Sequence, residues 1–245
     1  MLKHEIAMND PNDYADDIKA AIAHFWDTRL KQRSFSKSKE EKDNRAAVVG
    51  GKQMDGFIQL FKQVATDFGV PSSCIFTKGN HLPGFFRPTK DWDFLVLSPQ
   101  HKLVALLEFK SQVGSFGNNF NNRTEEAIGS AVDVWTAFRE QVYPNQRPPW
   151  IGYLILVEKS VKSLTPVKVR SPYFSYLKEF EGTSYLERYA ILCRKLMLER
   201  HYSATSLIWT DNKKNYGDMA QELSINGFIA SFVGCLQSWK TEFDE

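Results

Sequence analysis

The sequence has few of the features that mark secreted, fibrous or membrane-spanning proteins. Three cysteines occur among 245 residues (Cys74, Cys193 and Cys235), and neither their number nor their spacing suits a disulfide framework or a metal motif. The longest apolar run, residues 150–157, is too short to cross a bilayer. Residues 1–11 are polar, so we expect no signal peptide. These absences predict a soluble protein of a reducing cytoplasm.

No charge of one sign dominates the chain. Lys and Arg number 31 and Asp and Glu 29, so a nucleic-acid surface would have to arise from local clustering. One cluster covers residues 29–45, where three acidic residues accompany seven basic ones: Arg29, Lys31, Arg33, Lys37, Lys39, Lys42 and Arg45. Three serines there disfavour a helix interior. A mobile basic arm that binds DNA and a solvated linker are both compatible with this composition.

Helical and strand patterns are mixed along the chain, without an internal repeat or a clear linker. Apolar spacing predicts helices at residues 12–33, 46–68, 124–142, 184–201 and 223–243. Apolar runs predict strands at residues 92–97, 103–109, 150–157 and 205–209. This order predicts a single domain over residues 1–245 of the α/β or α+β class, with a mixed central sheet flanked by helices.

Two of these strands bring charged residues to one end of an apolar hairpin. An antiparallel pairing that sets Leu95 opposite Leu106 also sets Asp93 opposite Glu108, with Lys110 on the same face. Directly opposed Cβ atoms lie about 4.5–5.5 Å apart. Two carboxylates at this separation repel each other unless a cation lies between them. Mg²⁺ suits such a place, because it commonly uses one or two protein carboxylates together with substrate phosphate.

The cluster of Asp93, Glu108 and Lys110 has two interpretations. In the first, the carboxylates bind a divalent cation and the lysine orients a water molecule, which allows metal-assisted hydrolysis of a phosphodiester bond. In the second, the three side chains form a partly buried ion network without a catalytic task. Short patterns of this kind match by chance, so the spacing alone does not decide between them.

A longer set of motifs resembles a known family. Asp93, followed after fourteen residues by Glu108-Phe109-Lys110, resembles the PD-(D/E)xK nuclease signature, although Trp92 replaces the usual proline. Three segments are similar to the XhoI restriction endonuclease family: Gly50-Gly-Lys-Gln-Met-Asp-Gly-Phe57, Leu82-Pro-Gly-Phe85 and Leu107-Glu-Phe-Lys-Ser-Gln-Val-Gly-Ser-Phe-Gly-Asn-Asn-Phe-Asn-Asn-Arg-Thr-Glu-Glu-Ala127. The resemblance covers residues 50–140, and the asparagine-rich block is its most specific part.

The resemblance implies a PD-(D/E)xK restriction-endonuclease-like core and a Mg²⁺-dependent type II site-specific deoxyribonuclease. Such an enzyme acts as a homodimer on double-stranded DNA. For this family the site is the palindrome CTCGAG, cut after the first C of each strand to leave 5′ overhangs. The resemblance also implies a bacterial cytoplasm, and a cognate DNA methyltransferase that protects the same site in the host without direct contact.

Carried over residue by residue, the resemblance makes Asp93 and Glu108 metal ligands. The backbone carbonyl of Phe109 completes the coordination, and Lys110 positions the attacking water. Asp55 is a candidate for a further acidic ligand, and a solvated helix position is the alternative.

Residues 114–123 follow the catalytic strand directly, and we expect them to contact DNA. Asn pairs with adenine and Arg with guanine in the major groove. The candidates for such contacts are Asn118, Asn119, Asn121, Asn122 and Arg123. A capped turn is the alternative, because Asn and Gly suit turns regardless of function. Gln112 lies on the same strand face as Lys110, and we expect it either to contact DNA or to make a structural hydrogen bond. Within the basic segment at residues 29–45, the candidates for DNA contact are Lys37, Lys39 and Lys42.

Two other functions remain compatible with the sequence. A sequence-specific DNA-binding protein without catalysis would carry the acidic cluster only as an ion network. A PD-(D/E)xK nuclease acting on damaged or branched DNA would cut without sequence specificity. The asparagine block disfavours that nuclease, because a non-specific enzyme has less use for contacts to base edges. Digestion of a plasmid with Mg²⁺ separates the three functions. A restriction enzyme gives discrete bands, a DNA-binding protein leaves the plasmid intact, and a nuclease without sequence specificity gives a smear.

Overall fold

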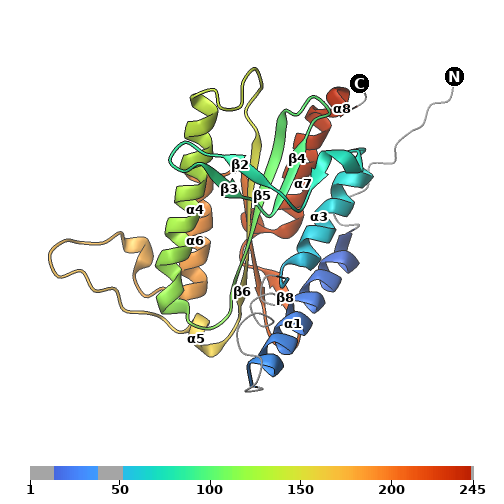
Figure 1. Ribbon diagram of the computed structural model, residues 1–245. Coiled ribbons are helices and arrows are strands. Elements are labelled where there is room, and N and C mark those ends of the chain that lie inside the picture. The colour runs from blue at the N-terminus through green and yellow to red at the C-terminus, as the bar shows by residue number, and fades with distance from the viewer. Residues whose placement is uncertain (1–13, 38–51, 244–245) are drawn as a thin grey trace.

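The computed structural model describes residues 14–37, with residues 33–37 as backbone only, and residues 52–243. The predicted mixed sheet is confirmed, and helices flank both of its faces (Figure 1). Its six strands lie in the order β1 (Ile75–Phe76), β4 (Phe94–Leu97), β5 (Leu103–Gln112), β6 (Trp150–Glu158), β7 (Ala204–Thr210) and β8 (Tyr216–Asp218). The central pairs β5–β6 and β6–β7 are parallel, and the outer pairs are antiparallel. A separate antiparallel hairpin is formed by β2 (His81–Pro83) and β3 (Thr89–Asp91).

Two layers of helices cover the main sheet (Figure 1). One layer contains α1 (Ala15–Lys37), α3 (Asp55–Asp67), α7 (Ile225–Ser238) and α8 (Lys240–Phe243), and the other contains α4 (Phe116–Arg139) and α6 (Tyr185–Leu198). The short helices are α5 (Val161–Leu164), η2 (Ser72–Cys74), η3 (Lys178–Phe180) and η4 (Gln221–Leu223). Within the described ranges, no helix has both the length and the apolar character needed to cross a membrane.

Strand β5 divides its side chains between the two layers, because successive residues of a strand point to opposite faces. Leu107 and Phe109 pack in the core beneath α1, α3 and α7. Leu106 packs in the core beneath α4 and α6, the side on which Glu108 contacts Tyr202. The apolar run that predicted this strand therefore serves two separate cores.

The predicted hairpin register is confirmed for residues 94–96. Phe94 pairs with Leu107 and Leu95 with Leu106, while a shift near the turn pairs Leu97 with Leu103 in place of Val104. Strand β4 begins at Phe94, one residue after Asp93. The strands β1, β2, β3 and β8 were not predicted, since each spans only two or three residues and shows no period.

The predicted start of the helix at residues 124–142 was wrong, because α4 begins at Phe116 and not at Thr124. The asparagines therefore lie on a helix and not in a loop. Packing explains the difference: the Phe116 ring stacks 6.1 Å from that of Tyr185, and the Phe120 ring lies 5.1 Å from that of Tyr189. These contacts with α6 outweigh the low helix propensity of Asn and Gly.

The first helix is longer than predicted, because α1 continues through Lys37 and not only to residue 33, and the DNA-binding role of residues 29–45 stays a prediction. The later turns of α1 are attached to the rest of the molecule. Arg29 donates a 3.3 Å hydrogen bond to the carbonyl of Val113, and Gln53 donates one of 2.6 Å to Gln32. Lys39 and Lys42 lie outside the described residues, as do residues 12–13 and 46–51 of the predicted helices.

Candidate active site

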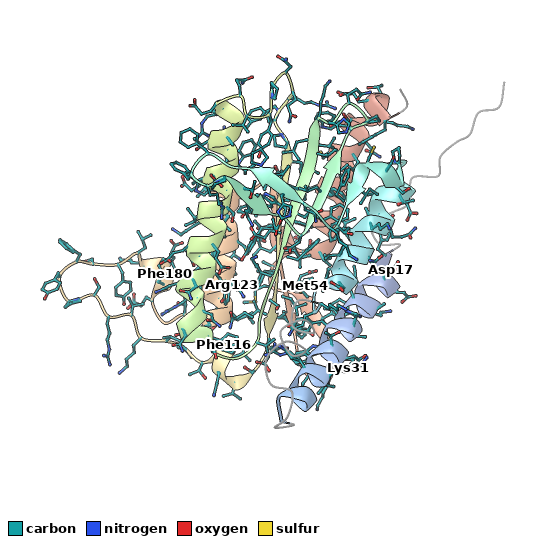
Figure 2. The ribbon with its side chains drawn as sticks, viewed as in Figure 1. Asp17, Lys31, Met54, Phe116, Arg123 and Phe180 are labelled. Carbon is teal, nitrogen blue, oxygen red and sulfur yellow. The ribbon has the colours of Figure 1, made fainter. Side chains whose placement is uncertain are left out.

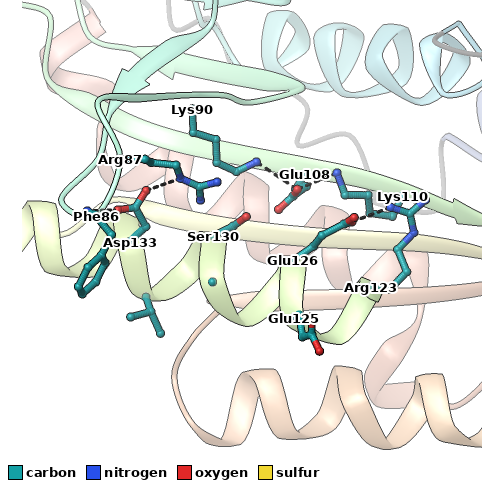
Figure 3. A pocket seen from close by; sticks show the side chains of 12 residues that line it. Phe86, Arg87, Lys90, Glu108, Lys110, Arg123, Glu125, Glu126, Ser130 and Asp133 are labelled. Carbon is teal, nitrogen blue, oxygen red and sulfur yellow. Dashed lines mark hydrogen bonds and ion pairs between the residues drawn. The ribbon is translucent and has the colours of Figure 1, made fainter. Parts of the chain in front are cut away.

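The charged end of the β4–β5 hairpin opens into a pocket of about 630 Å³ (Figure 3). Lys90, Glu108 and Lys110 line one wall, and they come from β3 and β5. The opposite wall is α4, which presents Arg123 and Glu126. Strands β3 and β5 supply the buried charge, and helix α4 supplies a polar wall that is open to solvent.

Glu108 is the centre of the cluster, with only 2% of its side chain exposed. Its Oε1 accepts hydrogen bonds from Lys110 Nζ at 2.7 Å and from Lys90 Nζ at 3.1 Å. The Tyr202 hydroxyl lies 3.3 Å from Oε2 and 3.0 Å from the carbonyl oxygen of Ala127. Burial alone would raise the pKa of Glu108, but the two lysines outweigh it and hold the pKa below its usual value. The carboxylate is therefore ionised at neutral pH.

Lys110 and Asp93 complete the cluster. Nearby charges outweigh the effect of burial on the pKa of Lys110, whereas burial outweighs nearby charges for Asp93. Burial alone would lower the pKa of Lys110, but the charges of Glu108 and Asp93 raise it above its usual value. Burial raises the pKa of Asp93, and the charge of Lys110 together with the Phe109 N–H only partly opposes this. That N–H donates to Asp93 Oδ2 at 2.7 Å. Lys110 thus stays charged, and Asp93 is the carboxylate that lacks sufficient positive charge nearby.

The donor set of this cluster fits a small, hard divalent cation. The available atoms are oxygens of two carboxylates, and the under-compensated Asp93 is stabilised by added positive charge. Over the part of the chain that the structure describes, no three His, Cys, Asp or Glu residues are grouped to hold a metal. Zinc sites use three or four protein ligands. Mg²⁺ needs fewer, because it retains water and binds phosphate.

The loop between β2 and β3 is attached to α4 through Asp133. The Asp133 carboxylate accepts hydrogen bonds from the N–H groups of Phe85 and Phe86 at 2.8 and 2.7 Å, and from Arg87 Nε at 2.6 Å. A Cβ atom on Gly84 would lie 2.8 Å from Cγ of Asp133, so the Leu-Pro-Gly-Phe motif requires its glycine. This attachment holds the hairpin in the position from which Lys90 reaches Glu108.

The predicted DNA-contacting residues occupy different environments. Asn118, Asn121 and Asn122 are exposed on the first turns of α4, and Asn119 is half-buried. Phe116 and Arg123 lie along the same helix (Figure 2), where Arg123 donates a 2.6 Å hydrogen bond to Glu126. Their roles towards DNA stay predictions.

Two predicted residues lie away from the pocket. Gln112 is buried and donates a 2.5 Å hydrogen bond to the carbonyl of Gly114. This is a structural hydrogen bond, the alternative to a DNA contact that the sequence left open for Gln112. Asp55 lines another hollow, between α1 and α3, beside His24. Their roles as a DNA contact and a metal ligand stay predictions.

Sequence reasoning missed Lys90, Tyr202, Arg87 and Asp133. Lys90 lies in a three-residue strand, and its ammonium group sits 4.5 Å from the centre of the Trp92 ring. Tyr202 follows α6 and reaches Glu108 across 94 positions of sequence. No local pattern could have indicated the contact of Tyr202, whereas the alternation of Lys90 with Trp92 was a weak signal for Lys90.

Comparison with known proteins gives one consistent result. The family described as Restriction endonuclease XhoI matches residues 31–221. The type II restriction enzyme BstVI of Geobacillus stearothermophilus is 45% identical over 206 residues, which cover 80% of this chain and 92% of that protein. The type II restriction enzyme XhoI of Xanthomonas vasicola is 45% identical over 194 residues, which cover 78% of each chain. AbrI of Azospirillum brasilense, another type II restriction enzyme, is 43% identical over 166 residues, 66% of this chain and 74% of that protein. No solved structure gives a significant match.

Proposed function

Because the chain belongs to the XhoI restriction endonuclease family, we propose that it cleaves double-stranded DNA at the palindrome CTCGAG with Mg²⁺. Family membership establishes the coarser function: the protein is a type II restriction endonuclease, a site-specific deoxyribonuclease that acts on DNA. Enzymes of this type generally use divalent metal ions. The proposal adds the site, the ion and a cut after the first C of each strand. A DNA-binding protein without catalysis and a nuclease without sequence specificity are both disfavoured by this membership.

The observation that carries the proposal is the 2.7 Å contact between Glu108 and Lys110 at the edge of the pocket, with Asp93 held by the Phe109 N–H just before the neighbouring strand β4. Asp93, Glu108 and the carbonyl of Phe109 would hold the cation. When bound, Mg²⁺ supplies positive charge that stabilises the phosphate oxygens and favours ionisation of a bound water. The proposal does not require Asp55.

The lysine performs the chain's own part of the chemistry. Lys110 stays protonated beside Glu108, so its N–H groups can orient a water and stabilise negative charge that develops on the phosphate. Lys90 contacts the same oxygen of Glu108 and rests on the Trp92 ring. We assign Lys90 a positioning role, because it fixes the carboxylate from β3 while Lys110 holds it from β5.

The palindrome also bears on assembly. Two copies related by a two-fold axis would each read one half-site and cut one strand, so the proposed active form is a homodimer. The proposed DNA contacts are Gln112, Asn118, Asn119, Asn121, Asn122, Arg123, Lys37, Lys39 and Lys42. A methyltransferase that modifies the same site would protect the host DNA.

Digestion of a plasmid that contains a single CTCGAG tests the proposal. We expect one linear product with Mg²⁺, none with Ca²⁺, and none from a plasmid in which one base of the site is changed. Lys110→Ala should leave the plasmid intact. Cleavage of both plasmids to a smear, or discrete cleavage at another sequence, would contradict the proposed specificity. Cleavage without any divalent cation would contradict the proposed chemistry.

A further inference from the structure

The stretch between Glu158 and Glu179 is basic and has no acidic residue. It contains Lys159, Lys162, Lys168, Arg170 and Lys178. The basic segment at residues 29–45, in contrast, carries three acidic residues. Most of the stretch leaves the body of the molecule as a long excursion between α5 and α6 (Figure 1). We call residues 165–178 the basic–aromatic arm.

The base of the arm is fixed to the protein. Pro166 forms a β-bridge with Ser184, and the N–H of Val167 donates to the carbonyl of Thr183 at 2.9 Å. Arg188 donates a 2.7 Å hydrogen bond to the carbonyl of Val167. The arm returns to the body at Phe180, which is labelled in Figure 2 and is partly buried. The arm therefore leaves the body from an ordered base.

Beyond its base the arm exposes both apolar and charged side chains. Tyr173 is 86% exposed and Phe174 83% exposed, so two adjacent aromatic rings face solvent as one apolar patch. Lys168, Arg170 and Lys178 are exposed and form no ion pair with any described residue, while the next acid, Glu179, is paired with Lys195. The arm thus presents uncompensated positive charge together with aromatic rings.

The arm begins beside the asparagines of α4. A groove of about 520 Å³ is lined by Phe116 and Asn118 from α4, by Lys162, and by Val167 and Tyr185 near the base of the arm. The opposite end of the asparagine segment leads to Arg123, which lines the pocket of Glu108 and Lys110. Duplex DNA in contact with the pocket and with the start of α4 would therefore pass close to the base of the arm.

We propose that the basic–aromatic arm binds the backbone of duplex DNA beside the recognition site. Lys168, Arg170 and Lys178 would contact phosphates, and Tyr173 and Phe174 would pack against sugars. The proposal rests on the proposed function and adds a DNA contact to it. Charge favours DNA over a second copy of the chain, because pairing two identical arms brings cations of the same sign together, whereas phosphates neutralise them.

A matched pair of double variants tests the proposal on the full-length protein. Lys168→Gln with Arg170→Gln removes two charges from the arm, and Lys62→Gln with Lys240→Gln removes two from exposed positions on α3 and α8. Binding to a short duplex without CTCGAG is measured with Ca²⁺ at several salt concentrations. The slope of log K against log salt should flatten by about 0.9 for each lost phosphate contact in the arm variant, and should stay unchanged in the control. Equal slopes in the wild type and the arm variant would overturn the proposal.

Two further measurements distinguish failure of the DNA-binding arm from failure of the proposed endonuclease function, and DNA binding by the arm from contact with a second copy of the chain. If the wild type binds DNA but cleaves no plasmid, the proposed function fails. The salt slopes still show whether the arm contacts DNA phosphates. Tyr173→Ser with Phe174→Ser should weaken DNA binding and leave the sedimentation coefficient of the free protein unchanged. A change from dimer to monomer in that variant would assign the arm to a second copy and overturn the proposal.

Discussion

The two faces of the central sheet differ in the charge that they bury. Beneath α1, α3 and α7, the Phe61 ring lies 5.5 Å from both Phe109 and Phe228 and 5.6 Å from Phe232. Beneath α4 and α6, the same strand buries Glu108 with its two lysines. Buried hydroxyls without a hydrogen-bond partner among the described residues occur on both sides, with Tyr153 and Tyr189 on this side and Ser206 on the other.

This difference assigns separate tasks to consecutive residues. Phe109 adds apolar contacts to one core, and Glu108 brings charge into the other. Buried charges cost free energy, so the retention of Glu108 and its two lysines on this face indicates that the face is used for function. Substitutions on the two faces should therefore separate DNA cleavage from stability.

The largest effect is expected for Lys110→Met, which keeps much of the side-chain length and removes the charge. Cleavage in a single turnover should fall by about a thousandfold or more, since the phosphate loses a preorganised donor. Binding of CTCGAG duplex with Ca²⁺ should stay close to that of the wild type. Lys62→Met, at an exposed position on α3, is the control and should cleave normally. A cleavage rate for Lys110→Met equal to that of the control would remove the lysine from the proposed chemistry.

On the opposite face, Phe61→Ala should lower the free energy of unfolding by about 3–5 kcal/mol, because it leaves a cavity among three aromatic rings. Urea denaturation measures this loss. The milder Phe61→Leu should stay folded and cleave DNA at nearly the rate of the wild type. A large loss of cleavage in folded Phe61→Leu would show that the two faces are not separable.

Asp133, in the wall of the pocket, should make the free energy of unfolding depend on pH. Burial would raise the pKa of Asp133, but the Arg87 guanidinium and the N–H groups of Phe86 and Phe85 hold it below its usual value. Its stabilising contribution is therefore present above the ordinary Asp pKa of about 3.9, and is lost as pH falls through the lower value of the folded state. Asp133→Asn should cost about 1.5–3 kcal/mol at neutral pH. Urea titrations of both proteins should converge in acid, and a constant difference would contradict this assignment.

The smallest effect is expected for Arg123, which lies on the polar face beside Glu126. If Arg123 reads guanine, Arg123→Ala should lower the discrimination between CTCGAG and a one-base variant by about 1–3 kcal/mol. Binding to both duplexes with Ca²⁺ gives this difference directly. Equal losses on both duplexes would make Arg123 a phosphate contact and leave base reading to the asparagines.

The parts of the site that follow from sequence are those that are local in the chain. The hairpin of β4 and β5 has a clear period, so the neighbouring positions of Asp93, Glu108 and Lys110 could be predicted from spacing. Lys90 and Tyr202 reach Glu108 from a short hairpin and from the far side of α6, and spacing carries no signal for such tertiary contacts.

The errors in helix boundaries have the same physical origin. Single-residue propensity favoured a loop at residues 114–123, but Phe116 and Phe120 pack on α6 and extend α4 over the asparagines. In α1, the hydrogen bond from Arg29 to Val113 holds a charged turn in helical form. In both places a contact with a distant segment outweighed the local preference.

The central claim, that the charged cluster is a catalytic site and not a structural ion network, is tested most directly with Glu108→Gln. This change keeps the shape of the side chain and removes the charge that Lys90 and Lys110 contact. Single-turnover cleavage with Mg²⁺ and duplex binding with Ca²⁺ are measured on one preparation. The account predicts that cleavage falls by about a thousandfold while binding to CTCGAG duplex changes by less than about tenfold. Cleavage by folded Glu108→Gln within about tenfold of the wild-type rate would contradict it.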